Sequence, residues 1–197
     1  MSNQFQIRES SIPGCFEVVP RVFEDERGYF VKTYHRDLYA ELGLHMPFAE
    51  EFYTYSRQRV LRGLHFQTPP MQADKIVCCL HGSVLDVVVD IRVGSPTYGK
   101  HCFFDLSGKK GTMVYIPVGL AHGFYVVSPF AVLLYKTGQV YSPEHDTGIR
   151  WDSAGISWPD SHPIVSQRDQ GFPVLSEFQS PFVFEPWRTE TNSTKSG

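Results

Sequence analysis

Residues Arg59–Arg92, with the sequence RVLRGLHFQTPPMQADKIVCCLHGSVLDVVVDIR, carry most of the information about the architecture of this chain. Alternating apolar and β-branched residues predict three strands, over residues 60–67, 75–80 and 84–91. Turn signals at residues 68–70 and 81–82 separate them. His65 is therefore expected on a strand. On the third strand, residues 86, 90 and 92 share parity, which predicts one polar face.

The rest of the chain continues this pattern of short strands and tight turns. From residue 48 to 157, turns rich in Gly and Pro recur about every 8 to 12 residues, which indicates an all-β sandwich or barrel. The 16 glycines, 14 prolines and 14% aromatic content agree with this class. Residues 14–20 and 29–34 predict a hairpin around Asp25–Gly28, and residues 35–44 predict the only substantial helix.

The length of 197 residues predicts a single domain, 1–197, with no internal repeat and no linker. We expect residues 5–185 to be ordered and the polar C-terminal tail to be mobile.

Charge and composition limit the possible partners. The net charge is −3 and the basic residues are dispersed, so we expect no nucleic-acid surface and only a small anionic ligand. No apolar run approaches the roughly 18 residues that span a bilayer, and no secretion signal begins the chain, so we expect no membrane partner and a cytoplasmic location. The four cysteines, at positions 15, 78, 79 and 102, show no CxxC spacing and are interpreted as reduced packing residues.

Residues Gly111–Phe124 resemble the second half of the cupin motif, with a Gly, then Pro-x-Gly, then His122. The positions that match the first half are His65, Gln67, Lys75 and Gly82. Cupin metal sites need several imidazole or carboxylate ligands, whereas here an amide replaces one imidazole and an ammonium replaces the carboxylate. The sequence therefore predicts a cupin pocket that holds no metal and needs no cofactor.

A histidine and a lysine in such a pocket suggest proton chemistry next to a carbonyl group. A neutral His65 can remove a proton from carbon if Lys75 stabilises the enolate oxygen that develops. Tyr135, on an otherwise apolar strand, can return a proton from the other face. Each residue also has a structural alternative: a core histidine, a solvated strand-edge lysine and a core aromatic ring.

Six sequence blocks, in this order along residues 5–175, resemble the dTDP-4-dehydrorhamnose 3,5-epimerase family: Asp25–Phe30, Arg62–Gln67, Asp86–Arg92 with Ser95–Gly99, Ile116–Phe124, Leu134–Lys136 and Ile156–Pro159. The resemblance implies an isomerase with a cupin-type jelly-roll β-sandwich and short helices. It implies His65 as base, Asp169 as its orienting carboxylate, Lys75 as the group that polarises the ketone, and Tyr135 as acid. It also implies a homodimer with exchanged N-terminal strands, and a nucleotide-diphosphate sugar whose pyrophosphate is held by Arg27, Arg62 and Arg168.

The remaining substrate-binding positions expected from this resemblance are Phe23, Phe30, Lys32, Glu50, Gln67, His122 and Tyr141. Two of them depart from the family, which has Gln-Asp-Asn where this chain has Glu50-Glu51-Phe52, and an acidic residue where it has Lys32. Lys32 and Glu50 are either a salt bridge with exchanged signs or evidence of a different base or sugar substituent.

Three functional classes remain open from the sequence. The first is an epimerase of a nucleotide-linked 4-keto-6-deoxyhexose that inverts carbon 3, carbon 5 or both, in deoxysugar biosynthesis. The second is a non-catalytic cupin-type module that binds such a sugar. A metal-dependent cupin enzyme is a third and more remote class. An acid and a base retained together favour the epimerase, because binding alone requires neither.

Overall fold

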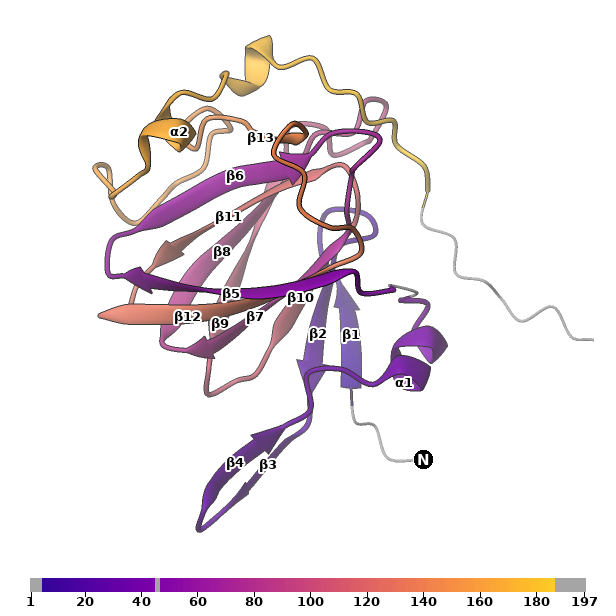
Figure 1. The fold of residues 1–197 in the computed structure, drawn as a ribbon, viewed down its shortest axis with the longest axis vertical. Helices are drawn as coiled ribbons and strands as arrows, with labels where there is room; N and C mark the ends of the chain where they lie inside the picture. The colour runs from indigo at the N-terminus through magenta and orange to yellow at the C-terminus, as the bar shows by residue number, and fades with distance from the viewer. Residues whose placement is uncertain (1–4, 45–46, 187–197) are drawn as a thin grey trace, which may run out of the picture.

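Two antiparallel sheets form the body of the protein in the computed structural model, which describes residues 5–44 and 47–186 (Figure 1). Within this part of the chain, the six-stranded sheet has the order β1 (Phe5–Glu9), β2 (Phe16–Pro20), β10 (Met113–Ile116), β7 (Lys75–His81), β12 (Phe130–Thr137) and β5 (Glu50–Arg57). The five-stranded sheet has the order β13 (Asp146–Gly148), β6 (Leu61–Gln67), β11 (Leu120–Val126), β8 (Ser83–Asp90) and β9 (His101–Ser107). The predicted all-β jelly-roll sandwich with short helices is confirmed.

The core lies between the two sheets, because alternate residues of each strand point inward. On β12 the alternation buries Ala131, Leu133 and Tyr135. They pack in one cluster with Val88 of β8 and Phe124 of β11 from the other sheet. Burying a side chain of this size contributes about 1.5–3 kcal/mol relative to leaving it in water.

The predicted N-terminal hairpin is wrong in its pairing. The strands around Asp25–Gly28 are shorter than expected, β3 (Val22–Asp25) and β4 (Gly28–Val31), and among the described strands they pair only with each other. Residues 16–20 instead form β2, which pairs with β1 and β10 inside the six-stranded sheet. As Figure 1 shows, the β3–β4 hairpin projects away from the body, with Phe30 60% exposed.

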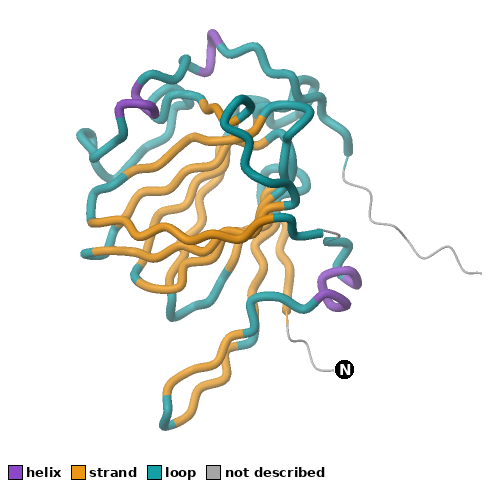
Figure 2. Tube along the Cα trace, in the orientation of Figure 1, coloured by secondary structure: helices purple, strands orange, loops and turns teal. Residues whose placement is uncertain are grey.

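Helices are few and short in the described residues (Figure 2). The helix expected over residues 35–44 is α1 (Arg36–Glu41), and it is shorter because His35 caps its start by accepting the N–H of Leu38. A second helix, α2 (Gln167–Gln170), and a 3₁₀ turn, η1 (Leu175–Glu177), lie in the long C-terminal segment. No helix in the described part of the chain is long and apolar enough to cross a membrane. The tail predicted to be mobile lies largely beyond residue 186, outside the described residues.

The polar face predicted for residues 86, 90 and 92 is present, but it is buried and paired within the protein. Asp90 is fully buried at the end of β8, and its carboxylate accepts from the backbone N–H and the guanidinium of Arg92. The hydroxyls of Ser95 and Thr97 donate to it at 2.6 and 2.7 Å. Burial alone would raise the pKa of Asp90, but the bonds from Arg92, Ser95 and Thr97 outweigh it and lower the pKa.

We expect Asp90→Ala to destabilise the fold by about 3–5 kcal/mol, because it leaves the buried Arg92 guanidinium without its carboxylate. The contribution of Asp90 is fully present above its unfolded-state pKa of about 3.9 and is lost as the pH falls through the depressed folded value. Urea unfolding at pH 7 measures the effect. Asp105→Ala, at an exposed position on the neighbouring strand β9, is the control and should change stability by less than about 0.5 kcal/mol. Equal losses in both variants would contradict this account.

Candidate active site

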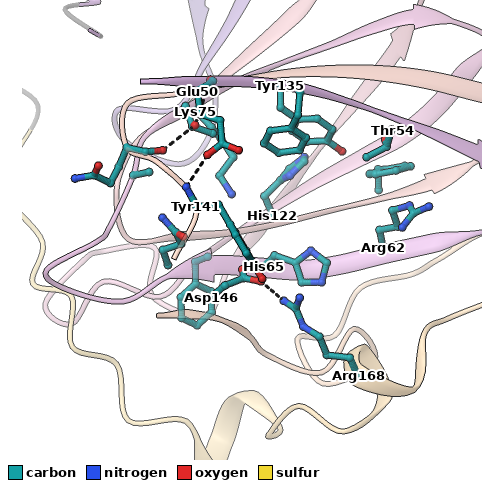
Figure 3. A pocket seen from close by; sticks show the side chains of 17 residues that line it. Glu50, Thr54, Arg62, His65, Lys75, His122, Tyr135, Tyr141, Asp146 and Arg168 are labelled. Carbon is teal, nitrogen blue, oxygen red and sulfur yellow. Dashed lines mark hydrogen bonds and ion pairs between the residues drawn. The ribbon is translucent and has the colours of Figure 1, made fainter. Parts of the chain in front are cut away.

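A cavity of about 360 Å³ opens between the two sheets and is lined from both of them (Figure 3). From the sequence-predicted set, the structure brings together His65, Lys75, Tyr135, Glu50, Arg62, Gln67, His122, Tyr141 and Arg168 around this cavity. Further lining residues that sequence analysis did not assign to the site include Phe52, Thr54, Gln139 and Asp146.

A β-bulge in β6 puts two of these side chains on the same wall. Opposite β11, the register advances by three residues on β6, from Arg62 to His65, but by only two on β11, from Phe124 to His122. The extra residue cancels the normal alternation, so Arg62 and His65 both face the cavity. Gly63 occupies the bulge with φ of 132°, and a Cβ there would lie 2.6 Å from the Cα of Gly123. Only glycine fits this close approach of the two strands.

His65 and Asp169 form a pair at the wall of the cavity. The imidazole Nε2 lies 2.9 Å from Asp169 Oδ1, although its N–H direction is not aligned for a hydrogen bond. Asp169 Oδ2 accepts the backbone N–H of Gly63 at 3.0 Å, and Ser166 caps α2 by accepting the N–H of Asp169. Burial alone would raise the pKa of Asp169, but the contacts with His65, Gly63 and Ser166 outweigh it and lower the pKa. A carboxylate held in this way orients the imidazole.

Lys75 approaches the same cavity from the other sheet. The strands of His65 and Lys75 are not neighbours in one sheet: β6 pairs with β11 and β13, whereas β7 pairs with β10 and β12. Both strands nevertheless contribute to the cavity, so His65 and Lys75 meet across the sandwich. Burial lowers the pKa of Lys75 to about 8, although the nearby carboxylates of Asp146 and Asp86 favour its charged form.

Tyr135 lies on the wall opposite His65, on β12 of the six-stranded sheet (Figure 3). Burial raises the pKa of this phenol well above its usual range, and the Asp86 carboxylate raises it further, whereas Thr54 and Arg62 act in the other direction. Tyr135 therefore stays protonated at neutral pH and can donate a proton.

A second histidine–carboxylate pair lies beneath the cavity. His122 Nε2 lies 2.8 Å from Asp86 Oδ2, and both side chains are buried. Asp86 Oδ1 has no hydrogen-bond partner among the described residues. Burial raises the pKa of Asp86, and its interactions with His122 and Lys75 offset only part of this effect. Sequence analysis did not assign Asp86 to the site, although a carboxylate between apolar residues of a strand was a usable signal.

The two ends of the cavity carry different groups (Figure 3). Arg62 lies toward one end, where its Nε donates to Ser56 Oγ at 2.9 Å. Glu50 lies toward the other, where its Oε2 accepts the backbone N–H of Tyr141 at 2.6 Å. Arg168 forms an ion pair with Asp146 at 2.6 Å.

Gln67, at the position of a cupin metal ligand, is engaged with loops. Its amide nitrogen donates to the carbonyls of Met71 and Val140, and its oxygen accepts the N–H of Ser142. Because the Gln67 amide is already hydrogen-bonded and Lys75 carries an ammonium group, the place of the cupin metal site offers poor ligands to a divalent cation. That the protein needs no metal stays a prediction.

Four residues of the predicted set do not line the cavity of their own chain: Phe23, Arg27 and Phe30 on the β3–β4 hairpin, and Lys32 directly after it. Arg27 instead pairs with Asp25 on the exposed hairpin. The prediction that Lys32 and Glu50 form a salt bridge with exchanged signs also remains untested, since Glu50 is the only one of the two that lines the cavity.

Comparison with known proteins agrees with this geometry. Residues 9–177 match the family model described as dTDP-4-dehydrorhamnose 3,5-epimerase. A dTDP-4-dehydrorhamnose 3,5-epimerase of Shigella flexneri is 40% identical over 164 residues, which cover 82% of this chain and 91% of that protein. A dTDP-4-dehydrorhamnose 3-epimerase of Streptomyces niveus is 39% identical over 176 residues, with 87% and 84% covered.

A solved structure extends the similarity to three dimensions. The dTDP-6-deoxy-D-glucose-3,5-epimerase of Legionella pneumophila, in complex with dTDP-4-keto-L-rhamnose, superposes with a TM-score of 0.87 and 34% identity. The match covers 92% of this chain and all of that one. The chain belongs to the dTDP-4-dehydrorhamnose 3,5-epimerase family.

Proposed function

We propose that this protein is an isomerase that epimerises a nucleotide-linked 4-keto-6-deoxyhexose in deoxysugar biosynthesis, by removing a proton from carbon and returning it to the opposite face. The observation that carries this proposal is the placement of a base and an acid on opposite walls of one cavity, His65 on β6 and Tyr135 on β12. Inversion requires this arrangement, whereas a sugar-binding module does not.

Each residue then has a defined task. His65, oriented by Asp169, takes the proton from a carbon next to the C4 ketone. The electrons of the broken C–H bond move onto the ketone oxygen, and the Lys75 ammonium stabilises the enolate that forms. Tyr135 gives its phenolic proton to the other face of the same carbon, and the resulting phenolate and imidazolium return to their starting states by proton exchange with solvent.

We also assign the charged and aromatic groups around the cavity to the nucleotide-diphosphate part of the substrate. Arg62 and Arg168 would bind the diphosphate, since guanidinium groups match phosphate geometry. Arg27, Phe23, Phe30 and Lys32 would reach a second cavity from the projecting hairpin, in a homodimer with exchanged N-terminal strands. The exposed aromatic rings of the hairpin support this assembly.

The chain is proposed to be one domain in a cytoplasmic enzyme that works without a cofactor. The family match spans residues 9–177, which include both sheets of the sandwich. All four cysteines are free thiols, as is usual for proteins of a reducing compartment.

A nucleotide with a base other than thymine is a second candidate substrate class, and Glu50 is the observation that favours it. This carboxylate lines the cavity, at a position where the sequence departs from the glutamine that the family resemblance implies. An ionised carboxylate accepts hydrogen bonds but donates none, so it suits a base edge with N–H donors and repels two carbonyl oxygens.

The first test is proton exchange at carbon. In deuterated water with dTDP-4-keto-6-deoxyglucose, the native protein should incorporate deuterium at carbon 3, carbon 5 or both, as located by NMR. His65→Asn should lower turnover and exchange about 10²- to 10⁴-fold, because the base is lost. Asp169→Asn should have a milder effect, since the imidazole remains but is less well oriented. Near-native exchange in His65→Asn would refute the assignment.

The pH profile tests Lys75. Because the ammonium must be charged to stabilise the enolate, kcat/KM should fall as the pH rises through the Lys75 pKa of about 8. Lys75→Arg, whose cation has a pKa above about 12, should move this alkaline limb to higher pH even if turnover is lower. Tyr135 does not produce the limb, because its pKa is raised above its usual range. An alkaline limb unchanged in Lys75→Arg would exclude Lys75 as its source.

Removing the phenol separates proton removal from proton return. Tyr135→Phe keeps the ring and its packing, so His65 should still form the enolate while inversion is lost. Deuterium wash-in and product stereochemistry should be measured on one sample, and exchange should exceed inversion. Full inversion without the hydroxyl would instead assign the acid's role to Tyr141, His122 or a water molecule.

The base preference is tested by affinities for dTDP, UDP, CDP and GDP, measured by calorimetry. If Glu50 pairs with N–H donors of the base, Glu50→Gln should shift the preference toward dTDP by about tenfold, the range of one paired hydrogen-bonding contact. Glutamine keeps an acceptor for the N–H of Tyr141, which makes it a conservative control for the fold. The same order of affinities in both proteins would leave thymine as the simpler assignment.

A further inference from the structure

An aromatic stack holds the proposed acid on its wall. Phe52 on β5 lies directly opposite Tyr135 on β12 in the strand register, so both side chains point to the same side of the sheet. Their rings are nearly parallel, with an interplanar angle of 10° and centroids 4.8 Å apart. Phe52 also lines the cavity and is 41% exposed.

Two further groups complete the surroundings of the phenol. The His122 ring meets the Tyr135 ring edge to face, with centroids 6.2 Å apart. Thr54, the next residue of β5 on the cavity side, has a buried hydroxyl, and this hydroxyl acts to lower the pKa of Tyr135. Phe52 and His122 therefore limit how far the phenol ring can swing about the Cα–Cβ bond of Tyr135, and with it the positions that the hydroxyl can reach.

We propose that Phe52 is a positioning residue that sets the ratio of inversion at carbon 3 to inversion at carbon 5 by fixing the direction of the Tyr135 hydroxyl. This inference rests on the proposed function of the cavity. It assigns a role to a residue at which the sequence departs from the asparagine that the family resemblance implies.

The physical reason is the geometry of the sugar. Carbons 3 and 5 flank the C4 carbonyl on opposite sides, so a single phenol must reach two different positions to protonate both. A ring that can swing serves both positions, whereas a ring held by stacking favours one. Small displacements of an acid from its line of attack change rates by large factors, so holding the ring is sufficient to bias the product.

Three variants test the proposal with dTDP-4-keto-6-deoxyglucose in deuterated water. Phe52→Asn removes the stack, Phe52→Tyr retains it, and Tyr53→Asn changes a side chain of the same strand that is 70% exposed and points to the opposite side of the sheet. We expect Phe52→Asn to change the ratio of carbon-3 to carbon-5 inversion by about 2- to 10-fold, the range set by one aromatic contact, while total exchange changes less. Phe52→Tyr and Tyr53→Asn should keep the native ratio. An unchanged ratio in Phe52→Asn, or an equal change in Tyr53→Asn, would overturn the proposal.

A second measurement needs no turnover. In protein with ¹³C-labelled tyrosine, the Tyr135 signals are assigned by their loss in Tyr135→Phe, and the flip rate of the ring is then measured by NMR. Phe52→Asn should speed the flips at least severalfold, and Phe52→Tyr should not. An unchanged flip rate in Phe52→Asn would show that the stack does not hold the ring. If the native protein exchanged no sugar proton, the proposed function would fail, while the flip rates would still decide whether Phe52 holds Tyr135.

Discussion

The bond between Asp169 and the bulged strand β6 is the contact on which the site depends. One carboxylate oxygen accepts the N–H of Gly63 and the other faces His65 Nε2, so a single side chain ties the C-terminal segment to the bulge and to the proposed base. The bulge in turn places Arg62 and His65 on one wall. Without an extra residue at this point, strand alternation would turn one of them away from the cavity. The close approach of Gly63 to Gly123 shows how little freedom the backbone has there.

Burial separates the proton affinities of the groups around the cavity. The Asp169 contacts lower the pKa of its carboxyl, whereas desolvation raises the pKa of Tyr135 and lowers the pKa of Lys75 to about 8. In the proposed mechanism, a carboxylate that stays charged beside an imidazole defines the base side of the cavity, and a phenol that stays neutral across from it defines the acid side. The unpaired oxygen of Asp86 shows that this polar cavity has an energetic cost inside an apolar sandwich.

Strand positions were predictable because alternation and turn residues are local signals, and β6, β7 and β8 fall where the pattern of residues 59–92 places them. Pairing was not predictable in the same way, since it depends on contacts between distant segments. Residues 16–20 pair with β10, more than 90 positions along the chain, and not with the strand after the Asp25–Gly28 turn. His65 and Lys75 meet because their strands lie in opposite sheets, and no property of the intervening turn encodes this. The role of Asp169 came only from family resemblance, since its own sequence context is a polar loop.

The number of carbons inverted depends on features finer than overall similarity. Relatives named as a 3,5-epimerase and as a 3-epimerase are 40% and 39% identical to this chain, so identity does not separate the two outcomes. In the proposed mechanism both reactions use the same base, the same cation and the same acid, so the two outcomes differ in which carbon the acid reaches. Phe52 stacks on the Tyr135 ring, and this is the contact that we propose to bias that reach. We therefore expect substitutions at residues beside the proposed acid, more than changes of the acid itself, to determine which carbons different members of the family invert.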